Sequence, residues 1–167
     1  GWVDLRSAKV AEQLAEFARH PKFVGVRHVV QDEPDDQFML CPDFLRGIAS
    51  LKEFDLTYDI LIFPKQLPAA IELAKHFPDQ PFVLDHIAKP LIKDDAISPW
   101  CEEIRKLAKC GNVLCKVSGM VTEANRTGWQ PDDFKPCLDI VFDAFGEDRL
   151  MFGSDWPVCQ LAGSYEQ

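Results

Sequence analysis

Short apolar runs alternate with amphipathic helical patterns from one end of the 167-residue chain to the other. Six of these runs have the length and composition of β-strands, at residues 2–5, 23–31, 58–63, 82–86, 113–118 and 150–152. Successive runs end about 30 residues apart, which is the length of one strand, helix and strand unit. Strands joined by crossovers of this length pair in parallel. We therefore expect a parallel α/β protein.

Helical periodicity fills the segments between these strands. Apolar residues recur at helical spacing after Ser7, which we expect to cap the first helix. Ser98 and Pro99 supply a cap and a first-turn proline for another helix, which reaches residue 110. The remaining helices are expected at residues 43–54, 68–76 and 131–145.

Six alternating strand and helix units can form two architectures, an open doubly wound sheet or part of a (β/α)8 barrel. An open sheet gathers its ligand groups at one switch point, whereas a barrel uses most of its strand ends. Charged residues close nearly every strand here, among them Arg27, Lys116 and Asp155. We therefore expect a TIM (β/α)8-type barrel. A complete barrel takes ~250 residues, so we expect residues 1–167 to be a single domain, a fragment of about six units that lacks the first strands.

The composition narrows the classes of partner. The formal net charge of −9 disfavours nucleic acid and anionic membrane surfaces, because both would repel the chain. No apolar run approaches the roughly 20 residues of a membrane span, and the first residues lack a signal-peptide pattern. The six cysteines include no C-x-x-C pair, so we expect reduced thiols in a cytoplasmic protein. A small molecule is the expected partner, and no oligomeric state is indicated.

Period-two alternation separates the two faces of each strand. In the second predicted strand, the face that carries Arg27 is expected to line the barrel interior, because an arginine needs an anion or a polar cavity. His28 then lies on the outer face, where a structural hydrogen bond is its expected role. The same alternation predicts Lys116 and Ser118 on the interior face of the fifth predicted strand.

The fourth predicted strand ends in a histidine. We expect His86 to share the interior face with Phe82 and Leu84, which leaves Asp85 on the opposite face. A histidine in this place is either a catalytic group or a hydrogen-bonded core residue. Lys89, three residues further on, is either a loop residue over the site or a solvated lysine.

Asp155 is the candidate general base. It follows two small residues, Gly153 and Ser154, which leave room for a ligand, and it precedes Trp156, a candidate wall of the site. A carboxylate at the end of a strand lies where a parallel α/β protein keeps its chemistry. The alternative is that Asp155, two residues before Pro157, only caps a turn or a short helix.

Four segments of the chain carry a family resemblance. They read GVRHVVQDEPD at residues 25–35, LDHIAKP at 84–90, CKVSG at 115–119 and FGSDWP at 152–157. Together they resemble the amidohydrolase-related (amidohydrolase 2) family, and most of all its sugar-lactonase branch, which includes fuconolactonase-like and pyrone-dicarboxylate-hydrolase-like enzymes. The resemblance covers essentially the whole chain. It implies a (β/α)8 barrel of the metal-dependent-hydrolase type that hydrolyses a lactone or a related ring.

The resemblance also implies roles for individual residues. Asp155 matches a last-strand aspartate that activates water, His86 the histidine of the Asp-His motif, and Arg27 a contact with a substrate anion or carbonyl. The family's His-x-His pair has no counterpart among the four histidines, and we expect it upstream of Gly1. With that pair, His86 and Asp155 are candidate ligands of one divalent metal ion, Zn or Mn, although some members of this branch work without metal. We expect the fragment alone to be inactive.

The leading hypothesis is a lactonase-like hydrolase that opens a small sugar lactone or cyclic ester with water activated by Asp155. His86 stabilises the developing oxyanion together with a metal or the interior cations. Two alternatives stay open, a metal-dependent decarboxylase of a sister branch and a noncatalytic barrel remnant that acts as a binding module. The expected substrate contacts are Arg27, Lys116, Ser118, Lys89 and Trp156.

Overall fold

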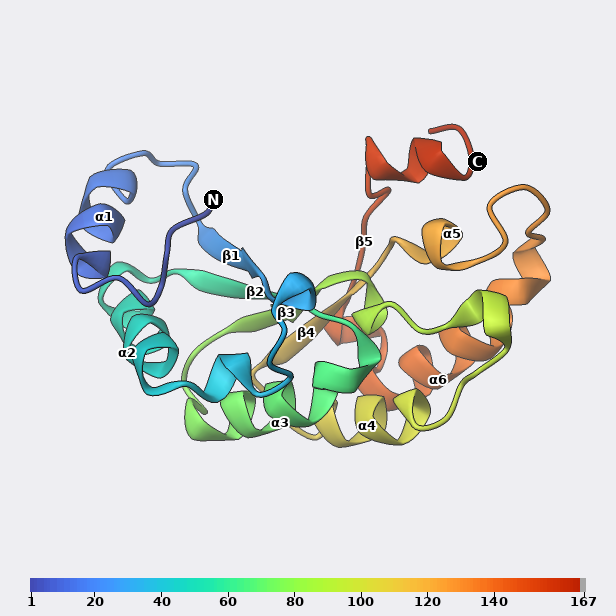
Figure 1. Cartoon of the computed structure of the whole chain (residues 1–167), viewed down its shortest axis with the longest axis horizontal. Helices are drawn as coiled ribbons and strands as arrows, with labels where there is room; N and C mark the ends of the chain where they lie inside the picture. The colour runs from blue at the N-terminus through green and yellow to red at the C-terminus, as the bar shows by residue number, and fades with distance from the viewer. Residues whose placement is uncertain (166–167) are drawn as a thin grey trace.

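The computed structural model describes residues 1–165 and shows one parallel five-stranded sheet with helices (Figure 1). The strands pair in unbroken chain order. An open doubly wound sheet reverses its strand order, whereas a (β/α)8 barrel wall keeps it, so the order supports the expected barrel architecture. The strands are β1 (Gly25–Val29), β2 (Thr57–Leu61), β3 (Phe82–Leu84), β4 (Val113–Val117) and β5 (Leu150–Phe152).

Helices lie along one side of this sheet. In Figure 1, α2, α3, α4 and α6 run beneath the strands, and α1 lies at the end nearest β1. Among residues 1–165, no helix is long and apolar enough to cross a membrane. The helices are α1 (Val10–Phe17), α2 (Pro42–Leu51), α3 (Leu67–His76), α4 (Trp100–Leu107), α5 (Met120–Glu123) and α6 (Lys135–Phe145).

The expected strand at residues 2–5 is wrong. Gly1 bonds to the backbone of β1 at 2.7 and 2.8 Å, but the next residues leave the sheet. The chain turns there because the Asp4 carboxylate accepts a hydrogen bond from the amide of Arg6 at 3.1 Å. Val3 and Leu5 are buried in the core, so their alternation with polar neighbours resembles that of a strand. The described residues thus contribute five strands to the sheet, one fewer than expected.

The starts of three expected helices also differ. α4 begins at Trp100, and the hydroxyl of Ser98 donates to the Glu102 carboxylate at 3.2 Å and caps no backbone amide. The hydroxyl of Ser7 accepts a hydrogen bond at 3.1 Å in the turn before α1 and does not cap the helix itself. The helix expected at residues 131–145 opens with a 3₁₀ turn and becomes α-helical at residue 135.

The helix-covered face of the sheet forms the core. His28 lies on this face, as expected, with Nε2 2.7 Å from a carboxylate oxygen of Glu33 and its ring stacked on Phe38. It therefore has the structural position predicted for it. The other buried side chains of this face are Val26, Tyr58, Ile60, Phe82, Leu84, Val113 and Cys115.

The opposite face of the sheet carries charged side chains. Arg27, Asp59 and Val83 lie side by side in one row across β1, β2 and β3. Leu114 continues this row in β4, which places Lys116, two residues further on, on the same face. Arg27 is exposed and Lys116 half-buried, because no helix of the described residues covers them. Alternation thus predicts Arg27 and Lys116 correctly, and this open face corresponds to the interior of a barrel.

Candidate active site

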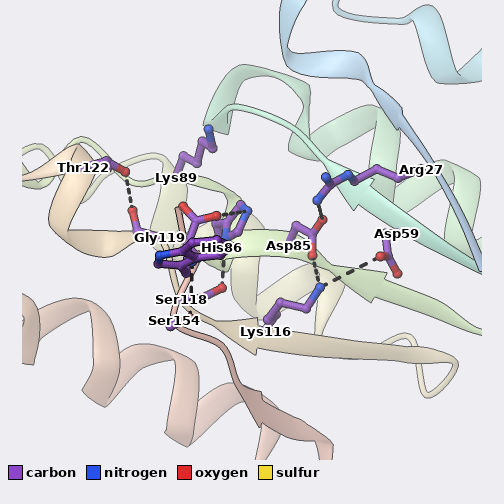
Figure 2. A network of polar contacts seen from close by, with 12 residues as sticks. Arg27, Asp59, Asp85, His86, Lys89, Lys116, Ser118, Gly119, Thr122 and Ser154 are labelled. Atoms are coloured by element: carbon purple, nitrogen blue, oxygen red, sulfur yellow. Dashed lines mark hydrogen bonds and ion pairs between the residues drawn. The ribbon is translucent and has the colours of Figure 1, made fainter. Parts of the chain in front are cut away.

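Asp85 is the centre of an ionic cluster on the open face (Figure 2). Its Oδ2 accepts a hydrogen bond from Arg27 Nη1 at 3.0 Å, and its Oδ1 accepts one from Lys116 Nζ. Lys116 Nζ also lies 3.9 Å from Asp59 Oδ2. The Asp85 side chain is fully buried, whereas the Arg27 side chain is 45% exposed. Asp85 therefore fixes the spacing of two cations that reach toward the open face.

Asp59 extends the cluster on β2. Burial raises the pKa of Asp59, and the Asp85 carboxylate raises it further, while Lys116 and Arg27 act in the opposite direction. With every group ionised, the cluster holds two positive and two negative charges. It thus offers hydrogen-bond donors and acceptors without a net charge, which suits a ligand rich in hydroxyl groups.

The position of Asp85 corrects the expected faces of β3. Val83 stands in one row with Arg27, so residue 83 and, two residues later, residue 85 point to the open face. Phe82 and Leu84 lie on the helix-covered face instead. All three residues of β3 are apolar and buried, so the alternation contains no polar position that could orient this strand.

His86 reaches the open face through a turn and not through the strand. Residues 86–89 have φ values of 54°, 48°, 57° and 50°, a left-handed turn that begins directly after Asp85. The turn brings the imidazole between two side chains from other strand ends. Nδ1 lies 2.8 Å from Ser118 Oγ, and Nε2 lies 3.5 Å from Asp155 Oδ1. The turn therefore joins the ends of β3, β4 and β5 at one point.

The environment of His86 favours the neutral imidazole. Burial lowers the pKa of His86, although the carboxylates of Asp155 and Asp85 oppose the shift. Gly119 leaves room for the ring, because a Cβ at this glycine would lie 2.8 Å from the His86 side chain. A neutral ring carries one proton on one nitrogen, so it can donate to one neighbour and accept from the other.

Asp155 lies at the end of β5 with its carboxylate toward His86. Its φ is 56°, and its side chain is 16% exposed. Its backbone carbonyl accepts the hydrogen bond of the following turn, from the amide of Cys159 at 3.0 Å. The turn is therefore bonded to the backbone of Asp155, and the carboxylate, which faces His86, does not act as its cap. Trp156 is 61% exposed beside it, consistent with a wall at the mouth of the site.

Lys89 is not a solvated lysine. Its Nζ lies 3.9 Å from Glu123 Oε1 and 5.5 Å from the centre of the Phe63 ring, and its side chain is 16% exposed. Burial raises the pKa of Glu123, while Lys89 lowers it. Lys89 thus connects the turn after β3 with the end of β2 and with α5, beside His86 (Figure 2).

An apolar cavity of about 320 Å³ adjoins this site between β5 and α6. Its wall includes Val117, Phe134 and Phe152. Val117 and Phe152 are register partners on the opposite face from Lys116, so the cavity lies across the sheet from the ionic cluster. Most of its lining is apolar, and Ser118, the hydroxyl partner of His86, is one of the residues where the cavity meets the site.

Comparison with known proteins gives the family. The model of the amidohydrolase family matches residues 1–167. The chain belongs to the amidohydrolase family. Two L-fucono-1,5-lactonases, from Burkholderia multivorans and Burkholderia ambifaria, are 45% and 41% identical to this amidohydrolase chain over 100% and 99% of its residues. The matches cover 60% and 57% of those proteins, so the chain spans somewhat more than half the length of these curated relatives.

Solved amidohydrolase structures share the fold. The crystal structure of an amidohydrolase from Burkholderia multivorans with bound zinc has a TM-score of 0.92 at 45% identity and covers 99% of this chain and 61% of its own. A structure from Pseudomonas putida has a TM-score of 0.75 at 22% identity over 99% of this chain and 59% of its own. The expected family and barrel fold class are therefore confirmed.

His86 and Asp155 alone do not complete a zinc site. A catalytic zinc ion usually has three protein ligands, and residues 1–165 contain no group of three or more His, Cys, Asp or Glu that could hold a metal. A metal bound at these two residues needs at least one further ligand. The zinc of the related amidohydrolase structure is a property of that protein.

Sequence interpretation missed two residues near the site. Asp59 is the one charged residue of β2, between the buried Tyr58 and Ile60, and its alternation with them is a signal that could have found it. Glu123 ends α5, a helix of four residues that is too short to show helical periodicity. Asp85 belongs to the motif at residues 84–90, but alternation assigns it to the wrong face.

Proposed function

We propose that the amidohydrolase carrying this chain hydrolyses a small sugar lactone or a related cyclic ester. The observation that carries the proposal is the convergence of His86, Ser118 and Asp155 at three strand ends beside the ionic cluster around Asp85. The L-fucono-1,5-lactonases at 45% and 41% identity support the substrate class. In this proposal residues 1–167 are the C-terminal portion of the barrel, and the protein is cytoplasmic with a small-molecule partner.

Asp155 is proposed as the general base. Its carboxylate takes a proton from a water molecule, whose oxygen then attacks the ring carbonyl of the lactone. The carbonyl oxygen becomes an oxyanion, the ring C–O bond breaks as the carbonyl re-forms, and the ring oxygen leaves as a hydroxyl after it receives the proton that Asp155 took from the water, which regenerates the carboxylate. The product is the open-chain hydroxy acid.

His86 and Ser118 hold this base in the proposal. With the Ser118 hydroxyl donating to Nδ1, the single ring proton of neutral His86 lies on Nε2 and faces Asp155. The imidazole then donates to the carboxylate, or to the oxyanion when substrate is present. Arg27 and Lys116, held by Asp85, supply donors to the substrate oxygens. Lys89 and Trp156 are proposed to border the bound ring.

One divalent ion, zinc or manganese, is proposed as the cofactor. The zinc in the related amidohydrolase structure supports this. His86, with its ring proton on Nδ1 toward Ser118 instead of on Nε2, and Asp155 would hold the ion with at least one additional ligand, and the ion would polarise the carbonyl or the attacking water.

The test is turnover of a panel of sugar lactones by the purified full-length protein, with products identified by NMR and released carbon dioxide measured in parallel. The proposal expects hydroxy acids from at least one 1,5-lactone and no carbon dioxide. Release of carbon dioxide from an aromatic or hydroxylated acid would support the decarboxylase alternative. Lactone binding without turnover would support the binding-module alternative and contradict the proposal.

A further inference from the structure

The turn that carries His86 is left-handed over four consecutive residues, none of them glycine. Residues 86–89 all have φ close to +50°. Residues with a Cβ enter this region as single positions, because the Cβ approaches the following carbonyl oxygen. Such backbone persists only where its surroundings hold it in place. The residues that hold this turn therefore decide where the His86 imidazole lies.

The indole of Trp100, from outside the turn, bonds directly to its backbone, and the Cys115 side chain contacts the backbone of the same residue, Ile87. Trp100, in the first turn of α4, donates a hydrogen bond from Nε1 to the carbonyl of Ile87 at 2.8 Å. Both groups are inaccessible to water, since Trp100 is 1% exposed and Ile87 is fully buried. Within the turn, the amide of Lys89 donates to the His86 carbonyl at 2.8 Å. The indole thus occupies an acceptor that water cannot reach.

We propose that Trp100 is a positioning residue for the active site. By holding the Ile87 carbonyl, its indole N–H stabilises the left-handed turn, and the turn places His86 against Ser118 and Asp155. Trp100 is packed in the hydrophobic core, and α4, which carries it, lies on the helix-covered side of the sheet.

Removal of the indole N–H leaves the Ile87 carbonyl buried without a donor. An unsatisfied buried carbonyl is unfavourable, and rotation of the turn toward right-handed backbone relieves both this defect and the left-handed strain. The same rotation moves the His86 ring away from Asp155. A displacement of about 1 Å at a catalytic group costs about 10²-fold in rate. Arg27 and Lys116, the proposed substrate contacts on β1 and β4, lie outside the turn, and Lys89 is the one proposed substrate contact within it, so KM should change less than kcat.

The kinetic arm rests on the proposed function and compares Trp100→Phe with Trp129→Phe in the full-length protein. Trp129 is the matched control, because its indole also donates to a backbone carbonyl, that of Ala162 at 2.7 Å, away from the turn. We expect Trp100→Phe to lower kcat by about 10²-fold with KM within a few fold. We expect Trp129→Phe to keep kcat close to the parent value.

The structural arm does not require lactonase activity. NMR chemical shifts and HN–Hα couplings of Ile87 and Ala88 report the handedness of the turn, and we expect them to change in Trp100→Phe and to stay as in the parent in Trp129→Phe. If the parent opens no lactone, the proposed function fails while this arm still decides the inference.

A second variant keeps the test decisive if Trp100→Phe folds poorly. Glycine tolerates positive φ, so Ala88→Gly added to Trp100→Phe should restore part of the folding, the left-handed shifts and kcat. The inference is overturned if Trp100→Phe keeps the left-handed shifts and the parental kcat. It is also overturned if Trp129→Phe loses as much activity, or if Ala88→Gly restores nothing.

Discussion

Replacement of Asp85 by asparagine should destabilise the protein more than its single charge change suggests. The carboxylate is fully buried and accepts hydrogen bonds from both Arg27 and Lys116. An asparagine oxygen can still accept from one cation, but the amide nitrogen then faces the other cation, donor against donor. The variant therefore leaves one of the two cations without an acceptor at this position.

The size of the expected loss in unfolding free energy depends on how exposed the Arg27 and Lys116 side chains are. Two hydrogen bonds to charged groups contribute about 1.5–3 kcal/mol each when buried. The Arg27 side chain is 45% exposed and can turn to water, so its share falls to the ~0–1 kcal/mol of an exposed pair. The Lys116 side chain is 25% exposed and retains most of its share. We expect the free energy of unfolding to fall by about 1.5–4 kcal/mol.

Urea unfolding followed by tryptophan fluorescence measures this loss, with the m-value as the check that the unfolding transition itself is unchanged. Asp79→Asn is the matched control, because Asp79 pairs with Lys52 at 3.2 Å on the surface and should cost less than about 1 kcal/mol. Lys116→Met combined with Asp85→Asn should cost less than the sum of the single changes. A loss below about 0.5 kcal/mol for Asp85→Asn would refute the assignment of Asp85 as the buried anchor of two cations.

Two further predictions concern Asp59 and metal binding. Burial and Asp85 raise the pKa of Asp59, so the folded protein keeps this proton to higher pH than the unfolded chain and loses stability as pH rises above the ordinary value of 3.8. Asp59→Asn cannot ionise and should gain stability relative to the parent as pH rises above 3.8 in urea unfolding, and a difference that does not change with pH would contradict this. Isothermal titration of the 167-residue chain with zinc should give weak binding or none, because His86 and Asp155 supply two ligands. A tight stoichiometric site that is lost in His86→Ala would show that this ligand count is wrong.

The sequence predicts the sheet face of Arg27 and Lys116 and the parallel order of the strands. Arg27 and Lys116 each interrupt an apolar strand, so alternation assigns them to one face, and the paired strands place them there. The approximately 30-residue spacing of strand ends likewise predicts the parallel order. Five of the six expected strands are present.

The remaining features depend on tertiary contacts. In β3 every residue is apolar, so the inward direction of Asp85 follows only from the register with β2. The left-handed turn at residues 86–89 opposes the local preference of its four residues, and no sequence signal predicts it. Val3 and Leu5 are buried without entering the sheet, which alternation cannot distinguish from a strand.

The central claim is that Asp155 activates the water that opens a sugar lactone. The most direct measurement is the turnover number of Asp155→Asn in the full-length protein, beside Asp143→Asn as an exposed control on α6. The account predicts a loss of about 10²–10⁴-fold for Asp155→Asn, with unchanged unfolding by urea, and parental turnover for the control. Turnover of Asp155→Asn within a few fold of the parent would contradict it.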